Sequence, residues 1–372
     1  MKAAGASILL ILGLLAQASA VEWEIRRFDG RDHVSAQQVA EFYGLSPGSA
    51  AHTYQKGRRS LAFQKNVREM QINGLRYWLA FPTPERDGRL WVARLDLSET
   101  IEPALRPEQA PGISRPGLVV LDAGHGGSDK GTSGARQFEK NFTLDLARRV
   151  RDVLKASGLR VIMTRNADVS LELPQRSAIA NSKSGSGAIF VSLHFNSASN
   201  LAAQGFEIFC VTPRGAPSTE YDQLLERDMI REKGNASELP SFVLATSIYH
   251  AMHGQLDMGD RGVKRARFAV LRETKIPAVL VEGGFLSNAS DARQVASPEW
   301  RTRLARSIAD GILAYARLGA TGQPPPLAAE YRSQPPREVL ADLRLAGSSK
   351  TQPKTASKPD EAAINLRQLP ER

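Results

Sequence analysis

The sequence contains almost no cysteine. Cys210 is the single cysteine among 372 residues, so the chain cannot form an intramolecular disulfide, and a thiolate-ligated metal site is excluded. A metal bound by this chain must take its ligands from the six histidines and from carboxylates. With 42% apolar and 24% charged residues, the composition is that of a globular protein long enough for two domains.

Long hydrophobic runs are also missing. The apolar run at residues 8–15 follows Lys2 and precedes Ala18-Ser19-Ala20, and it is shorter than the roughly 20 residues that span a bilayer. A charged start, a short apolar centre and small residues are typical of a secretory signal peptide. We therefore predict a signal peptide at residues 1–20 and export to the periplasm or cell envelope of a bacterium. We expect no transmembrane segment in the mature chain.

Negative charge is outnumbered by positive charge. Lys and Arg total 49 against 39 Asp and Glu, which gives a formal net charge of +10. A basic exported protein suits an anionic polymer such as a cell wall, and charge alone would equally suit nucleic acid. The sequence has no nucleic-acid recognition motif and no basic run interleaved with aromatic residues, so we expect no nucleic-acid partner.

Residues 21–110 predict a small α+β module. A short helix follows Ser35, which can cap it, and ends at Gly44. Strand-like segments come next, and Asn73-Gly74 between two of them is a hairpin signal. The pattern from Gly30 to Val34 with the helix and hairpins resembles the amino-terminal domain named after copper amine oxidases. Three strand aromatics either pack in a core or stack on sugars: Tyr77, Trp78 and Trp91.

Proline-rich stretches flank the rest of the folded chain. Four prolines between residues 103 and 116 indicate a linker, which we place at residues 111–116. From 117 to 319, apolar strands alternate with amphipathic helices, which predicts an α/β domain with a mainly parallel twisted sheet and helices on both faces. Residues 320–372 are rich in Pro, Ser, Lys and Ala and predict a disordered tail.

Three predicted strands of this domain each lead into polar residues. The strand at residues 118–121 is followed by Asp122 and His125, the strand at 188–193 by His194, and the strand at 278–281 by Glu282. Because parallel strands carry their carboxyl ends to one edge of a sheet, we expect these side chains to share that edge.

A helix supplies a fourth group. Apolar residues recur at steps of four in this helix, at Phe142, Leu146 and Val150. Glu139 lies on the same face, in the first helical turn. This turn follows the first strand, so it also lies near the carboxyl edge of the sheet. Glu139 either joins the polar cluster or only complements the helix dipole.

Two histidines and two glutamates at one edge are the ingredients of a hydrolytic zinc site. We assign His125, Glu139 and His194 as Zn²⁺ ligands. Glu282 is assigned as the catalytic base, because the two glycines after it allow close approach of a substrate. Asp122 either orients the His125 ring or closes the strand end by hydrogen-bonding its own backbone.

The segments around these residues resemble one known family. They are similar, in the same order over residues 117–318, to the zinc-dependent N-acetylmuramoyl-L-alanine amidases of bacterial cell walls. The matching segments are Asp122-Ala-Gly-His-Gly-Gly-x-Asp129-x-Gly131, Glu139-Lys-x-x-x-Leu144, Thr164-Arg165, Ser192-Leu-His194-x-Asn196 and Val281-Glu282-Gly-Gly-Phe-Leu-Ser-Asn288. The resemblance implies zinc bound by two histidines and a glutamate, and a catalytic glutamate before Gly-Gly-Phe. It also implies hydrolysis of the amide between muramic acid and L-alanine in peptidoglycan.

Other positions in this resemblance have open roles. Arg165 and Arg176 either bind peptide carboxylates or form structural salt bridges, and Asn196 either contacts substrate or caps a loop. Residues 214–238 depart from the simplest family pattern and look inserted. In some relatives an inserted helix covers the zinc until an activator protein moves it. The segment is therefore either such a lid, with an activator as partner, or a charged surface insertion.

Two other functions use the same features. A non-catalytic peptidoglycan-binding or amidase-regulating protein on this fold would be expected to lose at least one of the four groups, and all four are present. A zinc peptidase or deacetylase would use the same chemistry on another bond, and only the resemblance points to the muramyl amide.

Overall fold

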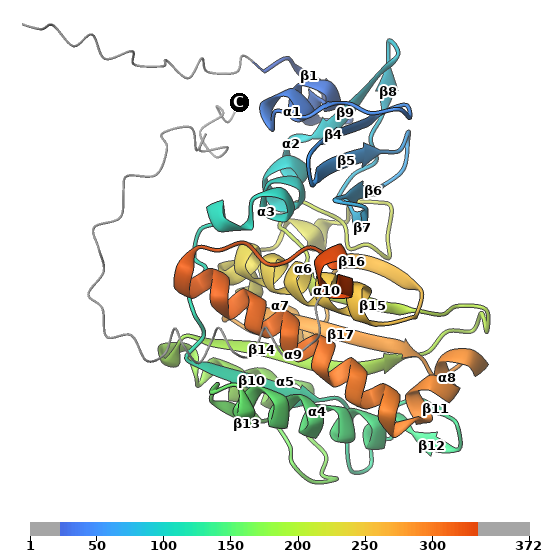
Figure 1. The fold of residues 1–372 in the computed structure, drawn as a ribbon, viewed down its shortest axis with the longest axis vertical. Coiled ribbons are helices and arrows are strands. Elements are labelled where there is room, and N and C mark those ends of the chain that lie inside the picture. The colour runs from blue at the N-terminus through green and yellow to red at the C-terminus, as the bar shows by residue number, and fades with distance from the viewer. Residues whose placement is uncertain (1–22, 334–372) are drawn as a thin grey trace, which may run out of the picture.

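The computed structural model describes residues 23–333, and Figure 1 shows its ribbon. The predicted signal peptide and residues 334–372 lie outside the described residues. The first part of the chain contains β1 (Ile25–Phe28), β2 (Arg31–Ser35), α1 (Ala36–Phe42), β3 (Ser46–Pro47), β4 (Thr53–Lys56), β5 (Arg59–Phe63), β6 (Glu69–Ile72), β7 (Leu75–Trp78), β8 (Glu85–Arg86), β9 (Arg89–Ala93), α2 (Arg94–Asp96), a π-helical turn (Leu97–Ile101) and α3 (Glu102–Leu105).

The second part carries the longer elements. They are β10 (Leu118–Ala123), β11 (Ser133–Gly134), β12 (Gln137–Phe138), α4 (Glu139–Ala156), β13 (Val161–Met163), α5 (Leu173–Asn181), β14 (Ala188–Asn196), β15 (Phe206–Val211), α6 (Glu238–Gln255), β16 (Asp260–Ala266), α7 (Ala269–Arg272), β17 (Ala278–Phe285), α8 (Ala289–Ala296), α9 (Pro298–Thr321) and α10 (Ala328–Ser333).

The second part folds as an α/β domain around a mainly parallel sheet, as predicted. Strands β13, β10, β14 and β17 are adjacent and parallel. Strand β15 pairs antiparallel with β17, and β16 runs parallel to β15, so these two strands point the opposite way. This reversal brings the first residues of β15 and β16 to the edge where β17 ends.

Helices cover both faces of this sheet. Every residue of β10 is buried, as expected for a strand covered on two sides. Val119 and Leu121 face the core formed with α4, α6 and α9, whereas Leu118 and Val120 face the smaller core formed with α5 and α7. Figure 1 shows α4 and α9 in front of the sheet and α5 behind it.

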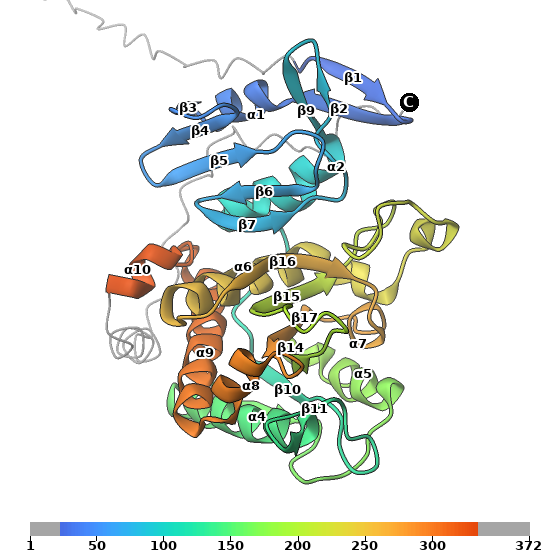
Figure 2. The ribbon, with the colours of Figure 1, turned by 90° about the vertical axis from the view of Figure 1, so that its right-hand side faces the viewer.

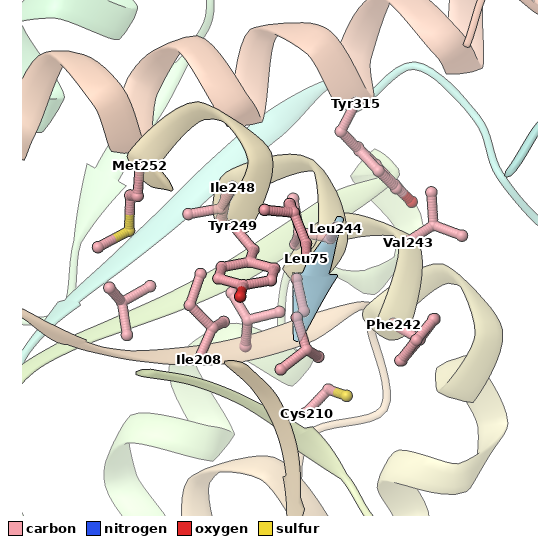
Figure 3. Close-up of a cluster of buried hydrophobic side chains, with 14 of the residues drawn as sticks. Leu75, Ile208, Cys210, Phe242, Val243, Leu244, Ile248, Tyr249, Met252 and Tyr315 are labelled. Atoms are coloured by element: carbon pink, nitrogen blue, oxygen red, sulfur yellow. The ribbon is translucent and has the colours of Figure 1, made fainter. Parts of the chain in front are cut away.

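The strands of the first part extend the same sheet. β7 joins β16 through the pair Tyr77 and Val263, which makes one sheet of eleven strands ending at β3. Leu75 packs beside Ile208 and residues of α6 (Figure 3). His250 of α6 lies 3.3 Å from the Tyr77 hydroxyl and accepts the Ala328 backbone N–H at 3.1 Å. One core therefore connects the first strands, α6 and α10, and Figure 2 shows the two parts stacked.

The predictions for the first part have mixed outcomes. β6 and β7 form the hairpin, with Asn73 and Gly74 both at positive φ, as a two-residue turn requires. Tyr77 and Trp91 are fully buried, so they belong to the core and cannot stack on sugars. Ser35 precedes α1, but its side chain makes no capping hydrogen bond, so the capping prediction was wrong.

The start of the predicted tail is ordered. α9 continues to Thr321 and ends at Gly322, whose φ of 72° gives a left-handed helix end. The chain then returns over α6 as α10, with Tyr331 6% exposed. The composition did not indicate this ordered segment. Its three prolines lie between α9 and α10, outside both helices, so they do not prevent α10 from forming. No helix in the described part of the chain is long and apolar enough to cross a membrane.

Candidate active site

Three adjacent parallel strands end at one edge of the sheet and carry the predicted polar residues. β14 lies between β10 and β17, and His194 of β14 is the register partner of Glu282 of β17. His125 follows β10, and Glu139 begins α4. The expectation that these groups share the carboxyl edge is therefore met in the structure.

His125, Glu139 and His194 converge on one point. The carboxylate of Glu139 lies between the rings, with one oxygen 3.0 Å from His125 Nε2 and the other 3.1 Å from His194 Nδ1. Each of the three residues offers one ligand atom, and these atoms lie within 4.8 Å of one another. Glu139 is buried, while the two imidazoles are partly exposed. The cluster is thus open to solvent on the histidine side.

Glycines make room for this cluster. A Cβ on Gly124 would lie 2.3 Å from the His194 ring, and a Cβ on Gly131 would lie 2.6 Å from a Glu139 oxygen. His125 itself has a φ of 58°, a conformation that costs free energy for a non-glycine residue. Strain of this kind collects at functional sites, and here it turns the imidazole toward Glu139.

Contacts within the cluster shift the pKa values of His125 and Glu139. Burial alone lowers the pKa of His125, but hydrogen bonds and charge attraction from Glu139 and Asp129 outweigh burial and raise it. Burial alone raises the pKa of Glu139, but its contacts with the two imidazoles outweigh burial and lower it far below the ordinary value. Glu139 is therefore an ionised carboxylate at neutral pH and can bind a cation together with the two imidazoles.

Asp129 orients His125, a role that the sequence analysis offered to Asp122. His125 Nδ1 donates to the Asp129 carboxylate, with both oxygens at 2.9 Å. Asp122 is fully buried and binds elsewhere, accepting hydrogen bonds from Thr164 Oγ1 at 2.6 Å and Ser192 Oγ at 2.8 Å. Both alternatives stated for Asp122 were wrong, because it neither contacts His125 nor closes its own turn.

The two arginines are structural. Arg176 is 3% exposed and forms a salt bridge of 2.7 Å with Asp122. It also donates to the backbone oxygen of His125 at 2.8 Å, so it stabilises the loop that carries His125. Arg165 is 2% exposed and donates to the backbone oxygens of Ala123 and Gly124. Burial removes both guanidinium groups from substrate, so a peptide-carboxylate role is excluded for them in this structure.

Asn196 and Glu207 form a feature that the sequence analysis did not identify. Asn196 Nδ2 donates to Glu207 Oε1 at 2.6 Å, so this amide holds a carboxylate rather than substrate, and its own oxygen accepts Ser197 N–H. Glu207 is 3% exposed and is the register partner of Glu282. The antiparallel direction of β15 places Glu207 there, and no local sequence signal announces that direction.

Glu282 is a carboxyl without a hydrogen-bond partner for one of its oxygens. Its Oε2 is buried and accepts no hydrogen bond among the described residues. Burial, followed by the negative charges of Glu139 and Glu207, raises the pKa of Glu282 well above its ordinary value. A buried unpaired oxygen is rare in folded proteins and is an indication of function.

Residues 214–238 do not cover this site. The segment follows the carboxyl end of β15, which points away from the histidine edge. Ser237 Oγ donates to Lys275 O at 2.7 Å, and Arg267 forms a 2.8 Å ion pair with Asp228, all at the opposite edge. Its helical turns are short 3-10 turns. Of the two alternatives for this segment, the structure therefore agrees with a surface insertion and not with a lid over the histidines.

The donor set fits a zinc ion. Zinc in hydrolytic sites takes imidazole nitrogens and a carboxylate oxygen and keeps one position open. Two imidazoles and an ionised carboxylate meet here with an orienting hydrogen bond on His125, as metal-bound histidines usually have. The fold and this cluster define the class of the protein as a candidate metallohydrolase.

Comparison with known proteins identifies the family. Residues 119–314 match the family model described as N-acetylmuramoyl-L-alanine amidase. This match covers more than half of the chain, which therefore belongs to the N-acetylmuramoyl-L-alanine amidase family.

Relatives with the same description are found by sequence, and solved structures of similar sequence exist. The chain is 30% identical over 256 residues to the N-acetylmuramoyl-L-alanine amidase AmiC of Escherichia coli O6:H1, covering 61% of this chain and 60% of that protein. It is 32% identical over 196 residues to CwlM of Bacillus licheniformis, covering 52% and 66%. The chain thus spans less than two thirds of the length of these relatives. Among solved structures, AmiC2 of Nostoc punctiforme is 30% identical with a TM-score of 0.45, covering 55% of this chain and 99% of that chain.

Proposed function

We propose that this chain is a zinc-dependent hydrolase that cleaves the amide bond between N-acetylmuramic acid and L-alanine in peptidoglycan. The proposal places the protein in the periplasm or cell envelope, where it would act in wall remodelling or cell separation. Membership of the amidase family and the positive net charge of +10 support an anionic wall polymer as substrate.

One observation carries the proposal. His125, Glu139 and His194 come from three separate elements, yet their ligand atoms lie within 4.8 Å of one another. Glu282 is the register partner of His194 on the next strand. A cation site with a carboxyl beside it is the arrangement that metal-assisted amide hydrolysis needs.

In this proposal the ligands have defined roles. His125 Nε2, a Glu139 oxygen and His194 Nδ1 would hold Zn²⁺. Asp129 keeps the proton of His125 on Nδ1, which leaves the Nε2 lone pair free for the metal. When bound, zinc supplies Lewis-acid polarisation of the scissile carbonyl and lowers the pKa of a water molecule from ~15.7 to about 7.

Glu282 would move the proton. As a base, its carboxylate takes a proton from the attacking water as the new C–O bond forms. As an acid, it gives that proton to the L-alanine nitrogen as the C–N bond breaks, which leaves a free amine and a lactyl carboxylate. Burial favours this role because it raises the pKa of Glu282 and so strengthens the base.

The proposed organisation of the chain follows from the same features. The catalytic domain would occupy residues 117–319, which include the family match at 119–314. A linker at 111–116 and the α+β module at 21–110 would precede it. The likeness of that module to the copper amine oxidase domain and the signal peptide at 1–20 stay predictions. An activator partner also stays a prediction, but without a lid at residues 214–238 for it to move.

Purified peptidoglycan tests the proposed reaction. The chain without residues 1–20 is incubated with sacculi, with and without a chelator, and released peptides are identified by mass. We expect intact stem peptides that begin with L-alanine, and no release after chelation. Shortened peptides or free sugars would indicate a different bond, and no product would favour a non-catalytic wall-binding or regulatory protein.

A Glu282→Gln variant tests the base. It should keep its zinc and lose about 10²-fold to 10⁴-fold in turnover, the usual contribution of a general acid or base. Asp310→Asn is the matched control, because Asp310 is another buried carboxyl with a raised pKa of about 6, on α9 outside the candidate site. Full activity of Glu282→Gln would refute the assigned role.

A further inference from the structure

We propose that Arg261 binds the first free carboxylate of the peptidoglycan stem peptide, beyond the amide that is cleaved. This inference rests on the proposed function and adds a specificity-determining residue to it. The subsite consists of Arg261 and of Glu207, which binds the guanidinium, together with Lys264 and Asn196, which in turn bind the Glu207 carboxylate.

Glu207 anchors this subsite beside the proposed base. It is the register partner of Glu282 across β15 and β17. Three donors hold its buried carboxylate. They are Lys264 Nζ at 2.5 Å, Asn196 Nδ2 at 2.6 Å and Arg261 Nε at 2.8 Å. Asn196 belongs to the strand that carries His194, so the anchor connects the candidate metal site with β16.

A bulge directs Arg261 to this carboxylate. Residues 261 and 264 differ by an odd number, so in a regular strand their side chains would point to opposite faces. The register of β16 against β15 shifts between Asp260 and Val263, and Gly262 has a φ of 87°. A Cβ on Gly262 would lie 2.9 Å from Arg76 O, so glycine is required there. Bulges beside active sites commonly re-aim a side chain in this way.

The group formed by Arg261, Lys264 and Glu207 carries a net positive charge. Arg261 and Lys264 share the Glu207 carboxylate, so among these three side chains one positive charge is in excess. The Lys264 side chain is 11% exposed and that of Arg261 is 38% exposed, so Arg261 presents this charge to solvent. Its Nε is bound to Glu207, but its two terminal nitrogens have no acceptor among residues 23–333. The guanidinium also lies over the Phe285 ring, 5.2 Å from its centroid. An arginine that is held through Nε and has both terminal nitrogens available is suited to bidentate binding of a carboxylate.

The distance from Glu282 suits a peptide. β16 is the second strand from β17, so the two backbones are about 10 Å apart, at roughly 4.8 Å per strand. An extended chain advances about 3.4 Å per residue. In the proposed binding mode the stem peptide runs across the strands from Glu282 toward β16. A carboxylate on the residue after the released alanine would then lie between Glu282 and β16, within reach of the long Arg261 side chain. The ligand class is a peptide with a free α-carboxylate at that residue.

Two matched substrates test the inference. They are N-acetylmuramyl tripeptides of sequence L-Ala, γ-linked D-Glu and L-Lys amide, which differ only in a free or an amidated α-carboxyl on the glutamate. We expect the wild type to favour the free form in kcat/KM by about 10-fold or more, the usual size of a hydrogen bond to a charged group. Arg261→Gln should bring this ratio to about 1, mainly through KM, and Arg261→Lys should restore part of it.

Arg149→Gln is the matched control. Arg149 is 31% exposed and its Nε also forms a 2.8 Å ion pair, with Asp145 of α4. This variant should keep the wild-type ratio. An unchanged ratio in Arg261→Gln, or equal losses on both substrates, would overturn the inference and leave Arg261 a structural role.

A binding measurement separates the inference from the proposed function. If the wild type cleaves neither substrate, the proposed function fails. Calorimetry with the free tripeptide L-Ala, γ-D-Glu and L-Lys amide then decides the subsite. Binding that is about 10-fold weaker in Arg261→Gln supports it, and equal or undetectable binding in both proteins overturns it.

Discussion

Replacing Asp129 by Asn isolates the hydrogen bond that orients His125. The carboxylate accepts from His125 Nδ1, with both oxygens at 2.9 Å, and it also accepts the Gly131 backbone N–H at 3.1 Å. Asn is nearly isosteric, but its amide can present N–H to the ring and stabilise the wrong tautomer. The metal-facing nitrogen of His125 would then carry the proton, which must leave before zinc binds.

The magnitude follows from the exposure of this residue. Loss of an outer carboxylate partner typically costs 10-fold to 100-fold in metal affinity. The Asp129 side chain is 61% exposed, so solvent screens its charge and the lower end applies. We expect a zinc affinity about 10-fold weaker, which corresponds to roughly 1.4 kcal/mol.

Competition with a chromophoric chelator at fixed pH measures this change. Asp87→Asn is the control, because Asp87 is also exposed and ion-paired, with Arg26, in the first part of the chain. Both variants should unfold near the wild-type denaturant midpoint without metal. A zinc affinity of Asp129→Asn within about twofold of the control would refute the orienting role.

Two further predictions concern stability and packing. Gly131→Ala places a Cβ 2.6 Å from a Glu139 oxygen, so this variant should weaken zinc binding by about 10-fold or more. Gly57→Ala is the control, because Gly57 has a φ of 59° but open space around it, and its zinc affinity should not change. Equal zinc affinities of the two variants, measured by the same competition, would contradict the steric argument. Burial lowers the pKa of His250 to about 3, below the value of about 6.5 in an unfolded chain. Only the unfolded chain then binds this proton between these pH values, so stability should fall as pH drops through that window, by up to about 1.4 kcal/mol per unit. Urea unfolding at pH 7 and 4.5 should show a smaller acid effect in His250→Gln, and the same effect in both proteins would contradict the assignment.

Much of the fold and the central cluster was predictable because local patterns determine them. Apolar strands that alternate with amphipathic helices define a parallel sheet, and parallel strands must end at one edge. Polar residues directly after three such strands, and Glu139 on the apolar face of its helix, were therefore expected to meet. The predicted hairpin at Asn73-Gly74 formed for a similar local reason, since two consecutive residues there adopt positive φ.

The surroundings of the cluster depend on geometry that a local pattern does not contain. Asp122 and Asp129 lie in the same motif, and the left-handed backbone of His125 decides which carboxylate meets its ring. Burial of Arg165 follows from how the loop at residues 124–127 folds over it. Glu207 reaches the site because β15 reverses direction. The two parts of the chain share a sheet through β7 and β16, whose pairing crosses about 185 residues of sequence.

The zinc content of the folded protein tests the central claim most directly. The chain without residues 1–20, purified without added metal and dialysed against zinc buffer, is analysed by elemental mass spectrometry beside His125→Ala, Glu139→Gln and His194→Ala variants. We expect one zinc ion per chain in the wild type and loss of that ion in each variant. A folded wild type without zinc, or variants that keep the wild-type content, would contradict this claim.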